Sequence, residues 1–91
     1  ILKLYSVYDK QAMLFTQPFV AESNAMAKRM FLSGIASGKN PTMTDFADEY
    51  SLMFLGTFDE VKGQFYSVEN PLEVASGSEA LKILDSDSNL S

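Results

Sequence analysis

Two stretches of the chain are rich in Leu, Val, Phe and Tyr, and a polar turn interrupts each of them near its middle. In the first stretch the apolar segments are residues 2–8 and 12–17, and in the second they are residues 50–58 and 64–68. Aliphatic and aromatic residues on both sides of a short polar break are typical of an antiparallel hairpin. The pattern therefore predicts two hairpins that lie far apart in the sequence.

Turn-forming residues indicate where these strands reverse and end. Asp9 and Asp59 open the two turns, where an aspartate side chain can bond to nearby backbone amides. We expect Gly63 to supply the positive φ that a bulged hairpin loop needs. Pro18 and Pro71 follow the second strand of each hairpin, and we expect each strand to end there because proline has no amide hydrogen to donate.

The segment between the hairpins has the spacing of a helix over residues 24–37. Ser23 is the expected N-cap, and Gly38 followed by Asn40 and Pro41 is a stop signal. Apolar residues three and four positions apart form one stripe along this helix, which consists of Ala27, Met30, Phe31, Gly34 and Ile35. The stripe predicts that one side of the helix packs on the sheet.

The remaining segments are interpreted as connections. The loop after the helix contains isolated Met43 and Phe46, which we expect to attach it to the core. Ser78 is the expected cap of one or two helical turns, and residues 85–91 are expected to be a disordered acidic tail. Residues 1–84 then form a single α+β domain, a four-stranded antiparallel sheet from two hairpins with one helix between them (ββαββ).

Alternation along the predicted strands assigns their side chains to two rows. Ser6 and Gly56 are small and would let the helix approach closely, with Gly34 on the helix side, so their row is expected to face it: Leu2, Leu4, Ser6, Tyr8, Leu52, Phe54, Gly56 and Phe58. The other row, on the far face, includes Tyr5, Val7, Met53 and Leu55. These residues are too apolar for a solvated face.

Three kinds of cover for that far face stay open: a second copy of the chain, another protein, or the C-terminal segment with Leu81, Ile83 and Leu84. We expect a homo-oligomer, most simply a dimer, with an interface made by Tyr5, Val7, Met53 and Leu55.

Composition excludes several kinds of chemistry. The 91 residues include no Cys and no His, so there is no disulfide, no thiolate or imidazole metal ligand, no cysteine nucleophile and no Ser-His-Asp triad. No run of about 18 apolar residues is present, so we expect no membrane partner. Because Ile1 is not a methionine, we expect that one or more preceding residues have been removed.

Carboxylates are the remaining candidates for acid-base chemistry or for a hard cation. They are Asp45, Asp48, Glu49, Asp59 and Glu60, but no GxGxxG, P-loop or HExxH pattern accompanies them, and the spacing of an EF-hand loop is absent. We therefore interpret them as structural or solvated, and expect no catalytic residue, no metal, no cofactor and no enzymatic activity.

Charge and aromatic residues raise a different candidate function. The formal net charge is −5, yet five of the seven Lys and Arg lie in the first 40 residues, against two of the twelve acidic residues. Aromatic side chains beside cations are how single-strand binders stack bases and hold phosphates. The candidate nucleic-acid-binding residues are Lys3, Tyr5, Tyr8, Lys10, Phe15, Lys28 and Arg29. The alternative is that these aromatic side chains belong to the core.

A combination of short motifs resembles the small nonstructural protein of gokushoviruses, single-stranded-DNA phages of the microvirus group. The match covers about residues 2–68 and rests on Lys3, Tyr5, Ser6, Val7, Tyr8, Asp9, Ala12, Pro18, Phe19, Asn24, Arg29, Glu49, Tyr50, Leu52, Gly56, Phe58, Asp59 and Gly63. Family members usually carry a proline about three residues before the position of Tyr50, where this chain has Ala47.

The resemblance implies a phage protein absent from the mature capsid that acts when replication turns to single-strand synthesis and packaging, in the cytoplasm of the infected bacterial host. We expect a non-enzymatic accessory protein that contacts single-stranded DNA or phage replication or packaging proteins. The alternative is a protein-interaction module that binds a host or phage protein through the far face of its sheet and does not contact DNA.

Overall fold

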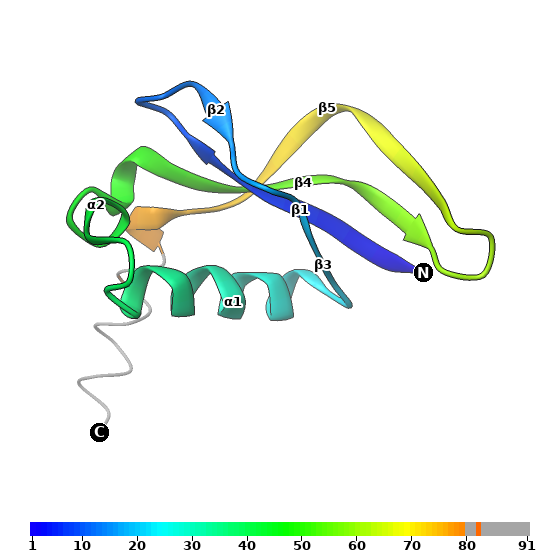
Figure 1. The fold of residues 1–91 in the computed structure, drawn as a ribbon, viewed down its shortest axis with the longest axis horizontal. Helices are drawn as coiled ribbons and strands as arrows, with labels where there is room; N and C mark the ends of the chain where they lie inside the picture. Colours follow the sequence, from blue (N-terminus) through cyan, green and yellow to red (C-terminus); the bar gives the residue numbers. More distant parts are fainter. Residues whose placement is uncertain (80–81, 83–91) are drawn as a thin grey trace.

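A curled antiparallel sheet lies over one long helix in the computed structural model, which describes residues 1–79 and residue 82 (Figure 1). The strand order is β2-β1-β4-β5, and β3 also pairs with β1. In chain order the elements are β1 (Leu2–Asp9), β2 (Leu14–Phe15), β3 (Phe19–Ala21), α1 (Asn24–Ala36), α2 (Pro41–Asp45), the 3-10 turn η1 (Ala47–Glu49), β4 (Tyr50–Asp59) and β5 (Gln64–Ser76). The predicted α+β class and antiparallel sheet are confirmed, and the ββαββ topology is matched only in part.

The strand expected to end at Pro18 resumes beyond it. β2 is only two residues long, and β3 pairs with β1 again through Lys3 and Tyr5. Between the two strands the Thr16 amide donates to the Val7 carbonyl at 2.8 Å, and the Val7 amide donates to the Thr16 hydroxyl at 3.1 Å. The Thr16 hydroxyl therefore takes the place of a backbone carbonyl as the acceptor for Val7, where the pairing passes from β2 to β3.

The last strand also passes its proline, contrary to the prediction. β5 pairs Ser67 with Gly56 and then Leu72 with Phe54, so residues 68–71 have no partner on β4. Pro71 lies in this unpaired segment, where its missing amide hydrogen costs no ladder bond. The segment forms the arch of β5 in Figure 1.

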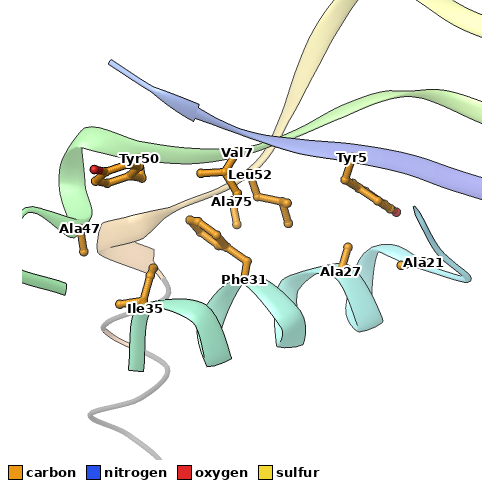
Figure 2. Close-up of a cluster of buried hydrophobic side chains, with 10 residues drawn as sticks. All are labelled: Tyr5, Val7, Ala21, Ala27, Phe31, Ile35, Ala47, Tyr50, Leu52 and Ala75. Atoms are coloured by element: carbon orange, nitrogen blue, oxygen red, sulfur yellow. The ribbon is translucent and has the colours of Figure 1, made fainter. Parts of the chain in front are cut away.

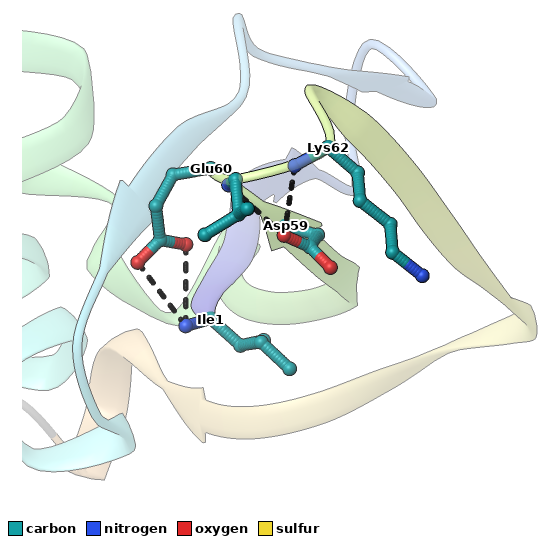
Figure 3. Close-up of polar contacts among 5 residues, drawn as sticks. Ile1, Asp59, Glu60 and Lys62 are labelled. Carbon is teal, nitrogen blue, oxygen red and sulfur yellow. Dashed lines mark hydrogen bonds and ion pairs between the residues drawn. The ribbon is translucent and has the colours of Figure 1, made fainter.

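The two hairpin turns have the same construction. One Asp9 carboxylate oxygen accepts from the amides of Gln11 and Ala12 at 3.0 and 3.2 Å. One Asp59 carboxylate oxygen accepts from the amides of Val61 and Lys62 at 3.0 and 3.1 Å (Figure 3). In each turn the fifth residue donates back to the aspartate carbonyl and has positive φ, 58° at Met13 and 66° at Gly63. The predicted roles of both aspartates and of Gly63 are confirmed.

A second polar contact lies beside the β4–β5 turn. The Ile1 amino nitrogen is 3.2 Å from the Glu60 carboxylate, and both groups are exposed (Figure 3). A hydrogen bond from the Glu60 backbone amide, followed by that from the Ile1 amino group, holds the pKa of Glu60 below its usual value.

Helix α1 begins and ends close to the predicted bounds. The Ser23 hydroxyl oxygen accepts from the Met26 amide at 3.2 Å, which is an N-cap, and Gly38 beyond the helix has a φ of 71°. Ala27, Phe31 and Ile35 of the predicted stripe are buried. Met30 and Gly34 do not belong to the buried face: Met30 is 45% exposed, and no atom lies near the missing Cβ of Gly34.

The predicted loop after α1 contains a short helix. Asn40 caps α2 by accepting from the Met43 amide at 3.2 Å, with Pro41 at the first helical position. The Thr44 hydroxyl donates to the Ile35 carbonyl at 2.7 Å and so joins α2 to the end of α1. Met43 packs against the core as expected, but Phe46 is 57% exposed.

The C-terminal helical turn begins earlier than predicted. Its cap is Ser76, not Ser78: the Ser76 hydroxyl accepts from the Glu79 amide at 3.1 Å, and the Glu79 carboxylate accepts from the Ser76 amide at 3.3 Å. This reciprocal pair is a capping box. Leu81, Ile83, Leu84 and the predicted tail 85–91 lie outside the described residues.

The core lies between the sheet and α1 and differs from the predicted row. Tyr5 and Val7 were assigned to the far face, but they are 0% and 8% exposed and point toward α1 together with Leu52 (Figure 2). The other buried apolar residues are Ala21, Ala27, Phe31, Ile35, Ala47, Tyr50 and Ala75.

A β-bulge explains the error. Leu4 pairs with Gly56 and Tyr5 pairs with Phe54, so Leu55 is an extra residue in β4 without a partner on β1. One extra residue reverses the alternation beyond it. Tyr5 therefore shares a face with Phe54, and Leu2 shares the opposite face with Phe58. The missing side chain of Gly56 makes room for the β5 backbone, which passes over it, and not for the helix.

Replacing Gly56 tests this close approach. A Cβ at Gly56 would lie 2.1 Å from the Tyr66 carbonyl oxygen, and the φ of 155° is one that side chains rarely adopt. We expect Gly56→Ala to lower the free energy of unfolding by about 3 kcal/mol, measured by urea denaturation. Gly34→Ala is the control, since nothing lies within 4 Å of its Cβ position. It should raise stability by about 0.5–1 kcal/mol, and equal effects at both positions would contradict the assigned geometry.

The two equivalent turns allow a matched test of backbone strain. Met13 and Gly63 occupy the same position with nearly the same positive φ, but only Met13 carries a Cβ. We expect Met13→Gly to raise the free energy of unfolding by about 0.5–1 kcal/mol and Gly63→Ala to lower it by about 1 kcal/mol. Thermal and urea unfolding measure both. A loss of stability in Met13→Gly would mean that the Met13 side chain contributes more than its backbone strain costs.

Candidate functional site

A basic cleft forms where α1 begins beneath the sheet. Lys3 of β1 and Lys28 of α1 line it, and the whole cavity measures about 340 Å³. Its other lining residues are Asn24, Phe54, Leu72, Glu73 and Val74. The cleft thus joins residues from four elements, β1, α1, β4 and β5.

The polar groups of the cleft are mainly hydrogen-bond donors. The Tyr5 hydroxyl donates to the Asn24 side-chain oxygen at 2.5 Å, so the group that Asn24 can offer to a ligand is its NH₂. Burial raises the pKa of Tyr5, which keeps this hydroxyl protonated. Two ammonium groups and an amide NH₂ together favour an anion.

The apolar wall of the cleft is held in place by the core. The Phe54 ring contacts the buried Tyr5 ring edge-on, with centroids 5.8 Å apart. Leu72 pairs with Phe54 across the strands and is 57% exposed. Glu73 is the one acidic residue that lines the cleft. Its carboxylate accepts a hydrogen bond from the Ser51 hydroxyl at 2.9 Å. Glu73 pairs with Met53, whose side chain lies on the opposite face of β4 from Phe54. An aromatic ring therefore lies beside donors, as in sites that stack a base and hold a phosphate.

The predicted nucleic-acid-binding residues do not form one platform. Lys3 and Lys28 meet in the cleft, whereas Tyr5 is buried beneath the sheet and cannot stack a base. Tyr8 and Phe15 pair on the far face with ring centroids 4.7 Å apart. The remaining two are elsewhere: the Lys10 ammonium is 3.5 Å from the Asp48 carbonyl, and Arg29 is exposed on α1 outside the cleft lining.

Sequence reasoning missed five of the residues that line the cleft, namely Asn24, Phe54, Leu72, Glu73 and Val74. Phe54 was assigned to the helix-facing row, which is correct, but its cleft partners Asn24 and Leu72 were not foreseen. Asn24 follows the Ser23 cap and belongs to the motifs that carry the family resemblance, but neither feature indicated that it lines a cleft. Leu72 follows Pro71, where the strand was expected to have ended, so no signal was available.

The predicted interface residues are also divided. Tyr5 and Val7 belong to the core and have no surface to offer, while Met53 and Leu55 are half-buried. Phe65, which the sequence had not singled out, is 65% exposed and contacts the Phe58 ring with centroids 4.7 Å apart. Direct pairing places Phe58 and Phe65 on the far face with Leu2.

Residues 1–79 and 82 contain neither a metal site of clustered side chains nor a membrane-spanning helix. No group of three or more acidic, Cys or His side chains gathers there in a way that could hold a metal ion. In the same residues no helix has both the length and the apolar character needed to cross a membrane.

Comparison with known proteins gives one family. Residues 2–80 match the family described as Phage ORF5 protein. Neither the curated proteins nor the solved structures that were compared contain a match to this chain. Since the matched segment covers most of the 91 residues, the chain belongs to the Phage ORF5 protein family and is a phage protein.

Proposed function

We propose that this phage protein is a non-enzymatic accessory factor in the synthesis or packaging of a single-stranded genome, and that it contacts single-stranded DNA through the basic cleft. Membership of the phage family supports the accessory role. The resemblance to the nonstructural protein of gokushoviruses supports the assignment to microviruses and to the cytoplasm of the infected bacterium.

The observation that supports DNA contact best is the convergence of Lys3 and Lys28 beside the Phe54 ring. These residues are far apart in the sequence, and only the fold brings them together. A phosphate bound by the two ammonium groups would place the adjoining base near the apolar wall of Phe54, Leu72 and Val74. The backbone charge of DNA and the π-face of a base match the two kinds of surface in the cleft.

The overall charge sets the strength of this interaction. The net charge of −5 repels a polyanion, so binding depends on a local patch and is strongest at low ionic strength. For two or three phosphate contacts to a single strand, affinity falls roughly tenfold between 50 and 200 mM salt.

Oligonucleotide titration tests this proposal. We expect a fluorescein-labelled oligothymidine of 20 nucleotides to bind the wild-type protein at low salt. Fluorescence anisotropy measures this binding. The double variant Lys3→Gln, Lys28→Gln should bind about tenfold more weakly and show a smaller salt dependence, because two phosphate contacts are removed.

The matched control is Lys39→Gln, Lys62→Gln, which changes the net charge equally at two residues outside the cleft lining. It should leave the affinity within about twofold of wild type, since distant exposed charges are largely screened. If the protein does not bind the oligonucleotide at low salt, direct DNA contact is refuted. If both double variants lose the same amount of affinity, the cleft is not the binding site.

The apolar far face favours a second candidate, a protein-interaction module. Leu2, Leu4, Tyr8, Met53 and Phe58 lie there partly exposed, and Phe15 and Phe65 extend the surface at 46% and 65% exposure. Several partly exposed apolar side chains on one face of a sheet favour an interaction site. The simplest partner is a second copy, which gives a dimer, and phage replication or packaging proteins are the other partners considered.

Sedimentation velocity tests the dimer. We expect the wild-type protein to sediment as a dimer and the double variant Phe15→Asp, Phe65→Asp to sediment as a monomer, because each carboxylate would have to be desolvated in the interface. Circular dichroism should show an unchanged fold, since both side chains are exposed.

Val61→Asp is the control for this change, because Val61 is 91% exposed at the β4–β5 turn. It should leave the dimer intact. A wild-type protein that stays monomeric at high concentration would contradict self-association through the far face.

A further inference from the structure

A second cavity is lined by residues of the β1–β2 turn, of α2 and of the segment that leads into β4. Figure 1 shows that the β1–β2 turn and α2 lie toward the C-terminal end of α1, whereas the basic cleft lies where α1 begins. The volume of the second cavity is about 400 Å³. The lining residues are Asp9, Gln11, Thr42, Phe46, Glu49 and Tyr50. No residue of the basic cleft takes part in it, so its chemistry is independent of DNA contact.

Two carboxylates give this cavity the opposite character. Asp9 uses one oxygen to bond the turn amides, and no residue in the described part of the chain donates to its other oxygen. Glu49 is half-buried beside it, and the Lys10 amide donates to the Glu49 carbonyl at 2.9 Å, which ties the turn to η1. The Lys10 ammonium, the nearest cation in sequence, is directed to the Asp48 carbonyl and does not line the cavity.

Tyr50 is the second and independent sign of a ligand. Its side chain is only 7% exposed, yet its hydroxyl forms no hydrogen bond with any described residue. Every fully buried polar side-chain atom of the described residues has a partner, so this hydroxyl must reach open space. In Figure 2 the oxygen lies at the end of the ring farthest from Val7 and Leu52, and Tyr50 lines the cavity. The hydroxyl therefore faces the cavity without a partner among residues 1–79 and 82, and a donor group of a ligand would find a free acceptor there.

The electrostatics and the rings around the hydroxyl indicate the charge of that ligand. Burial, and then the Asp9 carboxylate, raise the pKa of Tyr50, so the phenol stays neutral. Phe46 lines the same cavity and is 57% exposed, so its ring is accessible to a ligand. A guanidinium or ammonium group over an aromatic face is attracted by the ring quadrupole, more strongly when it is desolvated.

We infer that the cavity between the β1–β2 turn and α2 binds an arginine side chain from a basic segment of another protein. A guanidinium has five N–H donors in one plane. It can therefore satisfy the free Asp9 oxygen, the Glu49 carboxylate and the Tyr50 hydroxyl together while its face stacks on Phe46. An ammonium group satisfies the same acceptors without the stacking, so lysine is the weaker ligand. The partner is thus a cationic protein segment, and the contact joins two proteins and not protein and DNA.

Peptide binding tests this inference on the full chain. We expect a fluorescein-labelled hexa-arginine peptide to bind more tightly than hexa-lysine in an anisotropy titration. The double variant Asp9→Asn, Glu49→Gln should raise the Kd for hexa-arginine about tenfold or more, because charge-assisted hydrogen bonds are lost. Asn keeps the side-chain oxygen that the turn amides need. Tyr50→Phe, which removes only the hydroxyl, should raise the Kd about threefold.

The control is Asp59→Asn, Glu69→Gln, which makes the same chemical change at the equivalent turn of the other hairpin and at the exposed arch of β5. It should leave the Kd within about twofold of wild type, since those charges are distant and screened. An equal rise of the Kd in both double variants would show that the peptide responds only to the net negative charge of the protein. That result would overturn the site.

Two further measurements separate the remaining outcomes. In the wild-type protein saturated with hexa-arginine, NMR should show contacts between arginine side-chain protons and the Phe46 ring, and their absence would overturn the inference even if a variant fails to fold. Spermine titrated alone should bind more weakly than the peptide. Tighter binding of spermine through the same carboxylates would assign the cavity to a free polyamine and not to a protein segment.

Discussion

One extra residue in β4, Leu55, determines which side chains form the core. Because Leu4 pairs with Gly56 and Tyr5 with Phe54, the pleat of β4 reverses at Leu55 relative to β1. Tyr5 and Val7 consequently meet Leu52 beneath the sheet, and Phe58 lies on the far face. The β5 backbone closes over Gly56 at this point, and its unpaired arch follows on the next residues. The core, the basic cleft beside Phe54 and the aromatic far face all follow from this local irregularity.

Features determined by residues a few positions apart could be predicted from the sequence, and features that depend on distant pairing could not. The Ser23 cap and the Asp9 and Asp59 turns each need only three to five consecutive residues, so the amino-acid pattern is sufficient. Strand β3 and the second half of β5 need β1 and β4 as partners, which overrode the break expected at Pro18 and Pro71. For the same reason the sequence could name Lys3 and Lys28 as candidate cations, but it could not anticipate that both line one cleft with Asn24 or that Tyr5 is buried.

Folding places acidic and basic residues near opposite ends of α1, and this arrangement differs from their order in the sequence. The basic residues gather in the first 40 positions, yet Asp9 from that part joins Glu49 at the far end of α1. Lys3 and Lys28 remain at the near end, with the Glu73 carboxylate accepting from Ser51. The two cavities therefore offer donors at one end and acceptors at the other, so opposite ligands need not compete. At low salt such local charges would steer the two proposed ligands to opposite ends of the domain.

The distribution of aromatic side chains bears on what the far face can do. The core contains four alanines, Ala21, Ala27, Ala47 and Ala75, whereas Phe15 and Phe65 lie exposed on the side without a helix. Complete burial of one such ring contributes about 1.5–3 kcal/mol, while association costs about 4–15 kcal/mol in lost freedom. Two phenylalanines at the edges of the face are therefore too few for a stable contact. A partner has to cover Leu2, Leu4 and Met53 as well. It must therefore contact the far face between the β1–β2 and β4–β5 turns and not the turns alone.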